Sequence, residues 1–157
     1  MVTRSASSWP VPSLDPVLDF MRLLWGIEHG LQSTSKRMRA SHGVTGPQRL
    51  VLLIASQSPG ISAGEVAHVV RLHPSTLTGV IQRLVDKRLL IRDRDPRDTR
   101  RIRLRIAAAG QRVIRRSRGT VEAAVERALR RMSNIQVRHA REVLLTVANA
   151  RDGAAKN

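Results

Sequence analysis

Residues 89–106 restrict the fold of this chain more than any other segment, because the period of the apolar residues changes there from about 3.6 to about 2. In the second half of the segment, apolar residues alternate with basic ones: Arg101, Ile102, Arg103, Leu104, Arg105 and Ile106. Successive side chains of a strand point to opposite faces, so one face is apolar and the other carries guanidinium groups. Turn-forming residues, Asp95 to Asp98, lie in the middle of the segment. The segment therefore predicts a β-hairpin.

The chain before the hairpin has helical periodicity. Residues 1–12 are rich in Ser and Pro and show no period, so we expect a flexible N-terminal arm. Apolar residues then recur every three or four positions from Val17 to Met38, which predicts a long amphipathic helix within residues 13–42. The helix is expected to end near Ala40, because His42-Gly43 interrupts the pattern.

Three shorter helices are expected between this helix and the hairpin. Gly46-Pro47 places a proline where a helix can begin. Ser62 and Glu65 have the spacing of a capping box, which predicts a helix that ends near Val70. Pro74 can occupy the first turn of a further helix. The apolar residues of that helix share one face and leave a polar face opposite: Leu77, Val80, Ile81, Leu84 and Val85.

The helical period returns after Gly110 and continues to Met132, which predicts one long helix with a basic outer face. We interpret the basic residues within 112–131 as a solvated helix face and assign no site to them. Ser133 and Gln136 form a second capping box before a final helix. Residues 153–157 are expected to form a frayed tail.

The charge of the chain calls for a polyanionic partner. The 28 Lys and Arg residues outnumber the 12 Asp and Glu residues and give a formal net charge of +16. The partner could be duplex DNA, RNA or an anionic membrane surface. Only three aromatic residues are present, two Trp and one Phe, which argues against a platform that stacks single-stranded bases.

Other function classes are excluded by what the sequence lacks. It has no cysteine, which rules out disulfides, thiolate catalysis and cysteine zinc sites. The five histidines show no metal-ligand spacing, so no metal and no cofactor are expected. No glycine-rich phosphate loop or nucleophile elbow indicates an enzyme. No apolar run is long enough for a membrane span or a signal peptide, so a cytoplasmic protein, associated with the nucleoid when bound to DNA, is expected.

The order of helices followed by a charged hairpin predicts a winged helix-turn-helix, whose second helix docks in the major groove of DNA. The polar residues of that recognition helix are the candidate DNA contacts: Ser75, Thr76, Thr78, Gly79, Gln82 and Arg83. Arginines of the hairpin, or wing, extend the set: Arg94, Arg97, Arg100 and Arg101. Arg97 could enter the minor groove. Asp98 is expected to stabilise the wing by pairing with Arg100, and His73 could contact phosphate or cap the turn.

Ordered motifs from about Leu31 to Gly110 resemble the MarR family of bacterial transcription regulators. Residues 61–72 are similar to the capped helix of that family, residues 75–78 to its S-T-V-T/S signature, and residues 89–92 to its strand entry. The D-x-R element of the wing falls on residues 98–100, and residues 107–110 stand for L-T-x-x-G. Three positions depart from the family pattern: Gly79 replaces a larger residue, Arg88 a helix-ending glycine, and Ala107 a capping threonine.

The resemblance implies a mainly α fold with a small β-hairpin wing. A winged helix-turn-helix lobe (43–106) would lie between dimerisation helices in residues 13–42 and 107–152. The family dimerises through its first and last helices and binds an effector between those helices and the lobe, which implies a homodimer and suggests four pocket residues: Trp25, His29, His42 and Val44.

The implied function is a ligand-responsive repressor that binds a pseudo-palindromic operator in double-stranded DNA. An architectural protein of the nucleoid that coats DNA with low sequence specificity is the alternative. A dimeric adaptor that acts through protein contacts is a third reading, and such a protein should have lost the basic groups of its wing, which this chain retains.

Overall fold

The computed structural model describes residues 13–98 and 101–154, with only the backbone for 151–154. The expected arm (1–12) lies outside these residues, and α7 continues through Ala154, beyond the expected start of the tail at residue 153. The described elements are α1 (Pro16–His42), α2 (Gly46–Gln57), β1 (Ile61–Ser62), α3 (Ala63–Val70), α4 (Pro74–Asp86), β2 (Leu90–Arg94), β3 (Ile102–Ile106), α5 (Ala108–Arg115), α6 (Val121–Leu129) and α7 (Asn134–Ala154).

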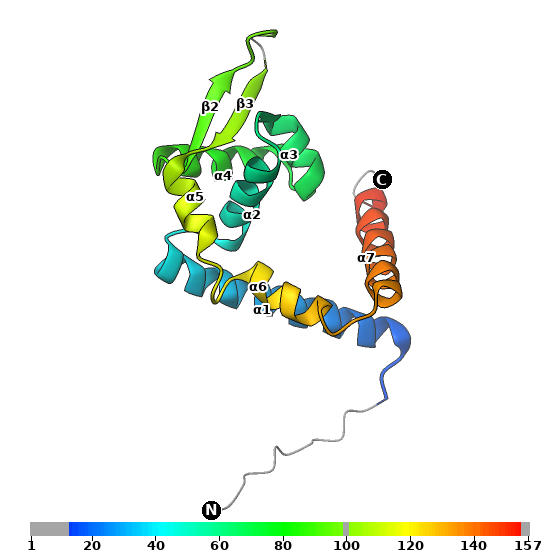
Figure 1. The fold of residues 1–157 in the computed structure, drawn as a ribbon. Helices are drawn as coiled ribbons and strands as arrows, with labels where there is room; N and C mark the ends of the chain where they lie inside the picture. Colours follow the sequence, from blue (N-terminus) through cyan, green and yellow to red (C-terminus); the bar gives the residue numbers. More distant parts are fainter. Residues whose placement is uncertain (1–12, 99–100, 155–157) are drawn as a thin grey trace, which may run out of the picture.

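Helices α2, α3 and α4 pack with the sheet into one lobe, from which the β2–β3 wing projects (Figure 1). The core of this lobe is formed by aliphatic side chains from all these helices and from the strands, among them Val51, Leu52, Val66, Leu77, Leu84 and Leu104, each at most 2% exposed. The helix faces that the sequence predicted to be apolar are thus buried in this core. The mainly helical winged fold is confirmed.

The hairpin is confirmed, and a third strand joins it. The antiparallel strands have the order β1-β3-β2, with Leu90 opposite Ile106 and Ile61 opposite Leu104. The sequence did not indicate β1, because two residues are too few to show a period of about two. This strand ties the start of α3 to the base of the wing.

Side-chain caps begin several of the helices. Ser62 and Glu65 form the expected capping box, with the Ser62 N–H donating to Glu65 Oε2 at 2.8 Å. The second expected box is also present, since the Ser133 N–H donates to Gln136 Oε1 at 2.8 Å. Thr45 provides a further box at the start of α2. These caps satisfy backbone donors that the first turn of a helix cannot pair internally.

The prediction of a single long helix after Gly110 is wrong. The chain leaves the helix after Arg115 and re-enters it at Val121, which separates α5 from α6. Gly119 adopts a φ of 76°, and the Thr120 side chain accepts from the Ala123 N–H as the cap of α6. A left-handed glycine followed by a helix cap interrupts the helix although the apolar period continues across the break.

A strained backbone position lies where α4 meets the wing. Arg88 adopts a φ of 56°, in the left-handed region that favours glycine, and is exposed. We therefore expect Arg88→Gly to raise the free energy of unfolding by about 0.5–1 kcal/mol, because relief of backbone strain outweighs the greater freedom of glycine in the unfolded chain. Urea denaturation would measure this change. Arg83→Gly, within α4, should instead destabilise, and stabilisation by both variants would argue against relief of strain.

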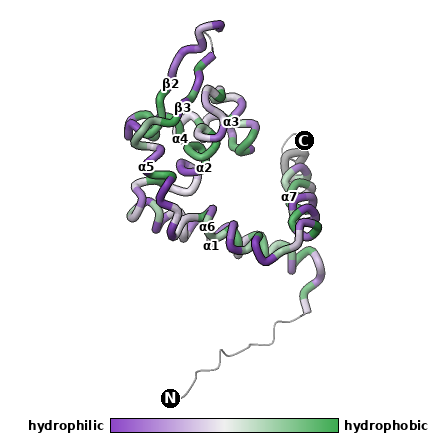
Figure 2. The backbone as a smooth tube through the Cα atoms, viewed as in Figure 1, coloured by the Kyte–Doolittle hydropathy of each residue, from purple (hydrophilic) through white to green (hydrophobic). Residues whose placement is uncertain are grey.

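Helix α5 packs against α2 at the edge of the lobe, and α1, α6 and α7 extend away from the lobe. Helix α5 leads from the wing to α1, α6 lies along α1, and α7 turns back towards α3 (Figure 1). Arg71 at the end of α3 donates to Asn149 Oδ1 on α7 at 2.8 Å. Apolar (green) and polar (purple) residues alternate along these helices in Figure 2. None of the described helices is both long and apolar enough to span a membrane.

Candidate nucleic-acid interface

Helix α4 separates its apolar residues from its polar ones. Leu77, Val80, Ile81 and Leu84 are buried against the lobe, each at most 7% exposed. The residues predicted to read DNA lie on the other side: Ser75, Thr76, Thr78, Gln82 and Arg83 are exposed, and Gly79 is half-buried. The structure therefore brings the six predicted residues of this helix together on one accessible face.

Two short side chains near the start of α4 are held by local hydrogen bonds. The Thr78 hydroxyl donates to the Pro74 carbonyl at 2.9 Å. His73 Nδ1 accepts from the Ser75 N–H at 3.3 Å and lies 2.7 Å from the Ser75 hydroxyl. The cap role of His73, left open by the sequence, is thus present in the structure. These bonds set the orientation of the first turn of the helix.

Gln82 connects α4 to the wing. Its amide nitrogen donates to Asp86 Oδ1 at 2.8 Å, and its amide oxygen accepts from Arg92 Nη1 at 3.1 Å. Arg92, on β2, was not among the residues predicted to contact DNA. The period-2 pattern could place it on an exposed face of the hairpin but could not show that it reaches α4.

Asp95 organises the turn of the wing. Its Oδ1 accepts from the Arg97 N–H at 2.8 Å and its Oδ2 accepts from Arg103 Nε at 2.8 Å. The Asp95 side chain is only 11% exposed. The backbone donor of Arg97, followed by the Arg103 guanidinium, holds the pKa of this carboxyl below its usual value of 3.8, although its burial opposes the shift. Because the pKa of Asp95 is lower in the folded state, its ionised carboxylate stabilises the folded protein at pH values above the usual pKa. This stabilisation is lost as the pH falls through the pKa of the folded state.

Asp98, which was predicted to stabilise the wing, has a different described partner. Its carboxylate lies 3.5 Å from Arg101 Nε, and its backbone carbonyl accepts from the Arg101 N–H at 2.9 Å. The predicted partner, Arg100, lies outside the described residues. Asp95 is the most buried of the described wing carboxylates, whereas the sequence analysis selected Asp98 for the stabilising role.

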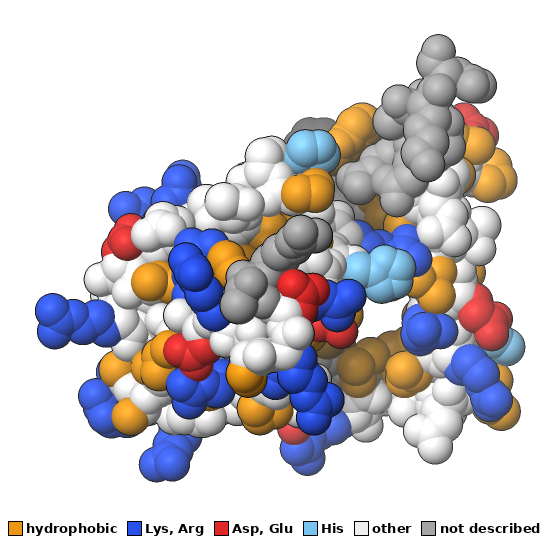
Figure 3. Space-filling model, turned by 90° about the horizontal axis from the view of Figure 1, so that it is seen from above, with side chains coloured by type: hydrophobic (Ala, Val, Ile, Leu, Met, Phe, Trp, Pro, Cys, Tyr) orange, Lys and Arg blue, Asp and Glu red, His pale blue; other side chains and the backbone are white. Residues whose placement is uncertain are grey.

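Basic side chains dominate the surface around the wing. Figure 3 looks down on the wing and shows many Lys and Arg side chains (blue) with fewer carboxylates (red). Arg94 and Arg97 are exposed and have no ion pair among the described residues, whereas Arg101, Arg103 and Arg105 form ion pairs with Asp98, Asp95 and Asp93, respectively. The wing thus contains arginines held by carboxylates and arginines that face solvent.

Residues 44–102, which span the lobe and most of the wing, match the model of the MarR family. Over this winged-helix region, the chain is similar to the MarR family. No curated protein sequence matches the chain.

Solved structures of MarR-type regulators share the fold over most of the chain. It is similar to the PcaV transcriptional regulator from Streptomyces coelicolor, solved with its natural ligand, with 26% identity, a TM-score of 0.71, and coverage of 90% of this chain and 99% of that one. It is also similar to S. aureus MepR in a complex with DNA: 18% identity, a TM-score of 0.68, and coverage of 83% and 96%. A MarR-family regulator from Rhodococcus sp. RHA1 has 23% identity, a TM-score of 0.67, and coverage of 87% and 98%.

The four residues suggested as an effector pocket by the MarR resemblance do not come together. Val44 is fully buried in the core of the lobe. Trp25 is 61% exposed on α1, and His42 lies roughly 25 Å further along that helix, at about 1.5 Å per residue. Burial in the core removes Val44 from this set, and the distance along α1 separates His42 from Trp25 and His29, whose role stays a prediction.

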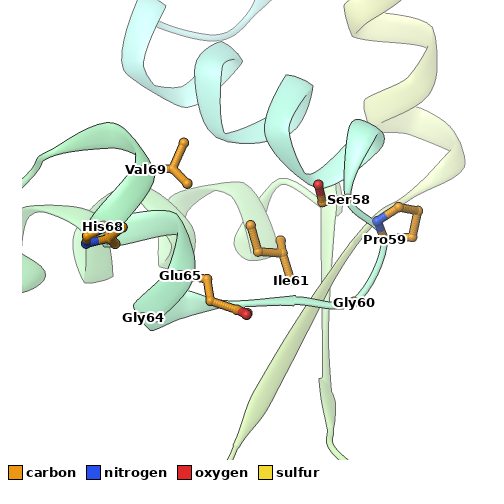
Figure 4. Close-up of a pocket in the computed structure, with 8 residues that line it drawn as sticks. All are labelled: Ser58, Pro59, Gly60, Ile61, Gly64, Glu65, His68 and Val69. Atoms are coloured by element: carbon orange, nitrogen blue, oxygen red, sulfur yellow. The ribbon is translucent and has the colours of Figure 1, made fainter.

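The structure has a hollow on another side of the lobe. A space of about 650 Å³ lies between the α2–β1 turn and the outer face of α3, lined by Pro59, Ile61, Glu65, His68, Val69 and their neighbours (Figure 4). The Glu65 carboxylate is engaged in the capping box, and hydrogen bonds from Ser62 lower its pKa. The described residues include no group of three potential metal ligands.

Proposed function

We propose that the chain is a sequence-specific regulator of transcription that binds double-stranded DNA as a homodimer. The observation that carries this proposal is the exposed polar face of α4 beside exposed arginines of the wing, on a MarR-family fold. Hydroxyl, amide and guanidinium groups can read base edges in the major groove. Wing arginines supply the phosphate contacts that orient a protein on DNA. The high net charge of +16 favours binding to DNA, which is a polyanion.

The homodimer is supported by apolar side chains exposed outside the lobe. Helices α1, α6 and α7 carry most of them: Val17, Leu18, Met21, Leu23, Trp25, Ile27, Leu31, Val125, Leu129, Ile135, Val143 and Leu144. In Figure 3 a gap separates the lobe from α7, with hydrophobic side chains visible below it. Exposed apolar surface of this extent marks an interaction site. A second copy would cover it and place two α4 helices about 34 Å apart, one DNA turn.

We further propose that the protein is a repressor and that a small molecule relieves the repression. It would act in the cytoplasm and would not be an enzyme. The similar PcaV regulator was solved with its natural ligand, which supports an effector for this chain. Trp25 and His29 are our remaining candidates for contacts with it. They lie one turn apart on α1, and both are exposed.

Selection of bound duplexes from a random DNA pool at about 150 mM salt tests the proposal. An inverted repeat, bound about a thousandfold more tightly than a scrambled duplex, is the expected result for a sequence-specific dimer. Equal affinity for every duplex would contradict it and would favour the architectural function that the net charge also permits.

Arg97 offers a test of the wing. It is exposed at the turn, and its backbone is fixed by Asp95. Arg97→Ala should weaken binding to all sequences and reduce the slope of log affinity against log salt by about one, because one phosphate contact is lost. Fluorescence anisotropy at several salt concentrations measures the slope. Arg130→Ala is the matched control, since Arg130 pairs with Glu126 on α6 and should leave the slope unchanged.

A further inference from the structure

The deepest charged side chain of the lobe has no part in the proposed DNA contacts. Arg49 lies on α2 and is 1% exposed. Its guanidinium donates to the carbonyl of Val113 through Nη1 and to the carbonyl of Ile114 through Nη2, each at 2.8 Å. Its Nε donates to the Glu122 carboxylate. One side chain of the lobe thus contacts both α5 and α6.

These contacts have favourable electrostatics at both helix ends. Val113 and Ile114 belong to the last turn of α5, where the carbonyls carry partial negative charge, and a guanidinium is the side chain that suits them. Glu122 lies in the first turn of α6, where a carboxylate is favoured. A buried guanidinium is tolerated only when its donors are paired, and Arg49 meets that condition here.

The Arg49 contacts span the break between α5 and α6. Five residues, Arg116 to Thr120, separate α5 from α6, and Gly119 has the left-handed φ of 76°. A short segment of this kind can change its backbone angles and let the two helices rotate. Arg49 holds the chain before the break through the two carbonyls and after it through Glu122. Near this point the Gly46 N–H, at the start of α2, donates to Ser35 Oγ on α1 at 2.8 Å.

We propose that the Arg49–Glu122 pair positions the DNA-reading lobe relative to the dimerisation helices and thereby sets the half-site spacing of the operator. This inference rests on the proposed dimeric function. Helix α6 carries part of the apolar face assigned to the dimer, whereas α2 belongs to the lobe. The angle between them determines the separation and rotation of the two α4 helices. One inserted base pair moves a half-site by about 3.4 Å and turns it by about 36°.

Glu122→Ala tests the pair without removing the buried arginine. Glu126→Ala is the matched control, because it removes the same charge from the same helix, and Glu126 pairs only within α6 to Arg130 among the described ion pairs. Affinities would be measured for the selected operator, for versions with one base pair added to or removed from its centre, and for a single half-site.

Wild type and Glu126→Ala should bind the altered spacings at least about tenfold more weakly than the selected operator, whereas Glu122→Ala should reduce this difference to about threefold or less. Affinity for the single half-site should be the same for all three, which a general loss of structure would not allow. Glu122→Gln, which keeps the size of the side chain and loses its charge, should show an intermediate difference and serves if the alanine variant does not fold.

The outcomes separate the two proposals. A wild-type protein that selects no inverted repeat overturns the proposed function itself. A wild-type protein with a strict spacing, shared unchanged by folded Glu122→Ala and Glu122→Gln, overturns the positioning role and leaves the proposed function intact.

Discussion

Gly110→Ala is expected to lower the free energy of unfolding by about 3 kcal/mol. A Cβ at this position would lie 2.3 Å from the Leu89 carbonyl oxygen and 2.7 Å from Ile106 Cγ1. The Leu89 carbonyl cannot easily move, because it accepts from the Ala107 N–H at 3.0 Å. The variant therefore has to push α5 away from the base of the wing. Chemical denaturation followed by circular dichroism measures the loss.

Gly79→Ala is the control for Gly110→Ala. Gly79 is also a helical glycine, but a Cβ there would have no neighbour within 4 Å. Alanine should therefore stabilise α4 by up to about 1 kcal/mol through its higher helix propensity. A Gly110→Ala variant as stable as wild type would show that α5 does not pack against the Leu89 carbonyl as closely as described.

Leu84→Ala is expected to lower the free energy of unfolding by about 3 kcal/mol, since it deletes buried methyl groups and leaves a cavity. Leu84 is fully buried and belongs to the core cluster beneath α4. The loss should appear as a lower denaturation midpoint with an unchanged slope.

The matched control for this variant is Leu50→Ala. Leu50 lies on α2 with 46% of its surface exposed, so its truncation should cost less than about 1 kcal/mol. Equal losses for the two variants would contradict the burial of Leu84 in the core. Because Leu84 lies on the buried face of α4, a folded Leu84→Ala variant tests packing and not DNA contact.

Local patterns predicted much of the fold and of the candidate interface. The spacing of Leu77, Val80 and Leu84 identified the buried side of α4 and therefore its exposed polar side. The Ser62 and Ser133 capping boxes were predicted correctly because both partners lie within one turn of helix. The alternation in residues 101–106 correctly predicted the hairpin.

Features that depend on distant partners were not predicted. The break between α5 and α6 was missed because Ile114 and Val121 are seven residues apart, about two helical turns, so the apolar residues on its two sides stay in phase. Strand β1 was missed because its two residues are defined only by pairing with β3. The sequence analysis selected Asp98 as the wing-stabilising carboxylate, and only the contacts of Asp95 with Arg97 and Arg103 showed the role of Asp95 in the turn.

The sequence by itself determined most of the helices, the hairpin, two capping boxes and the basic character of the wing, because each depends on residues within a few positions of one another. Only the tertiary structure decided that Arg49 is buried, since its carbonyl partners lie 64 and 65 residues further along the chain. It also decided that Trp25 and Val44 belong to different environments, one exposed on α1 and the other in the core of the lobe. Burial and long-range pairing arise from how the elements pack, and no local period encodes them.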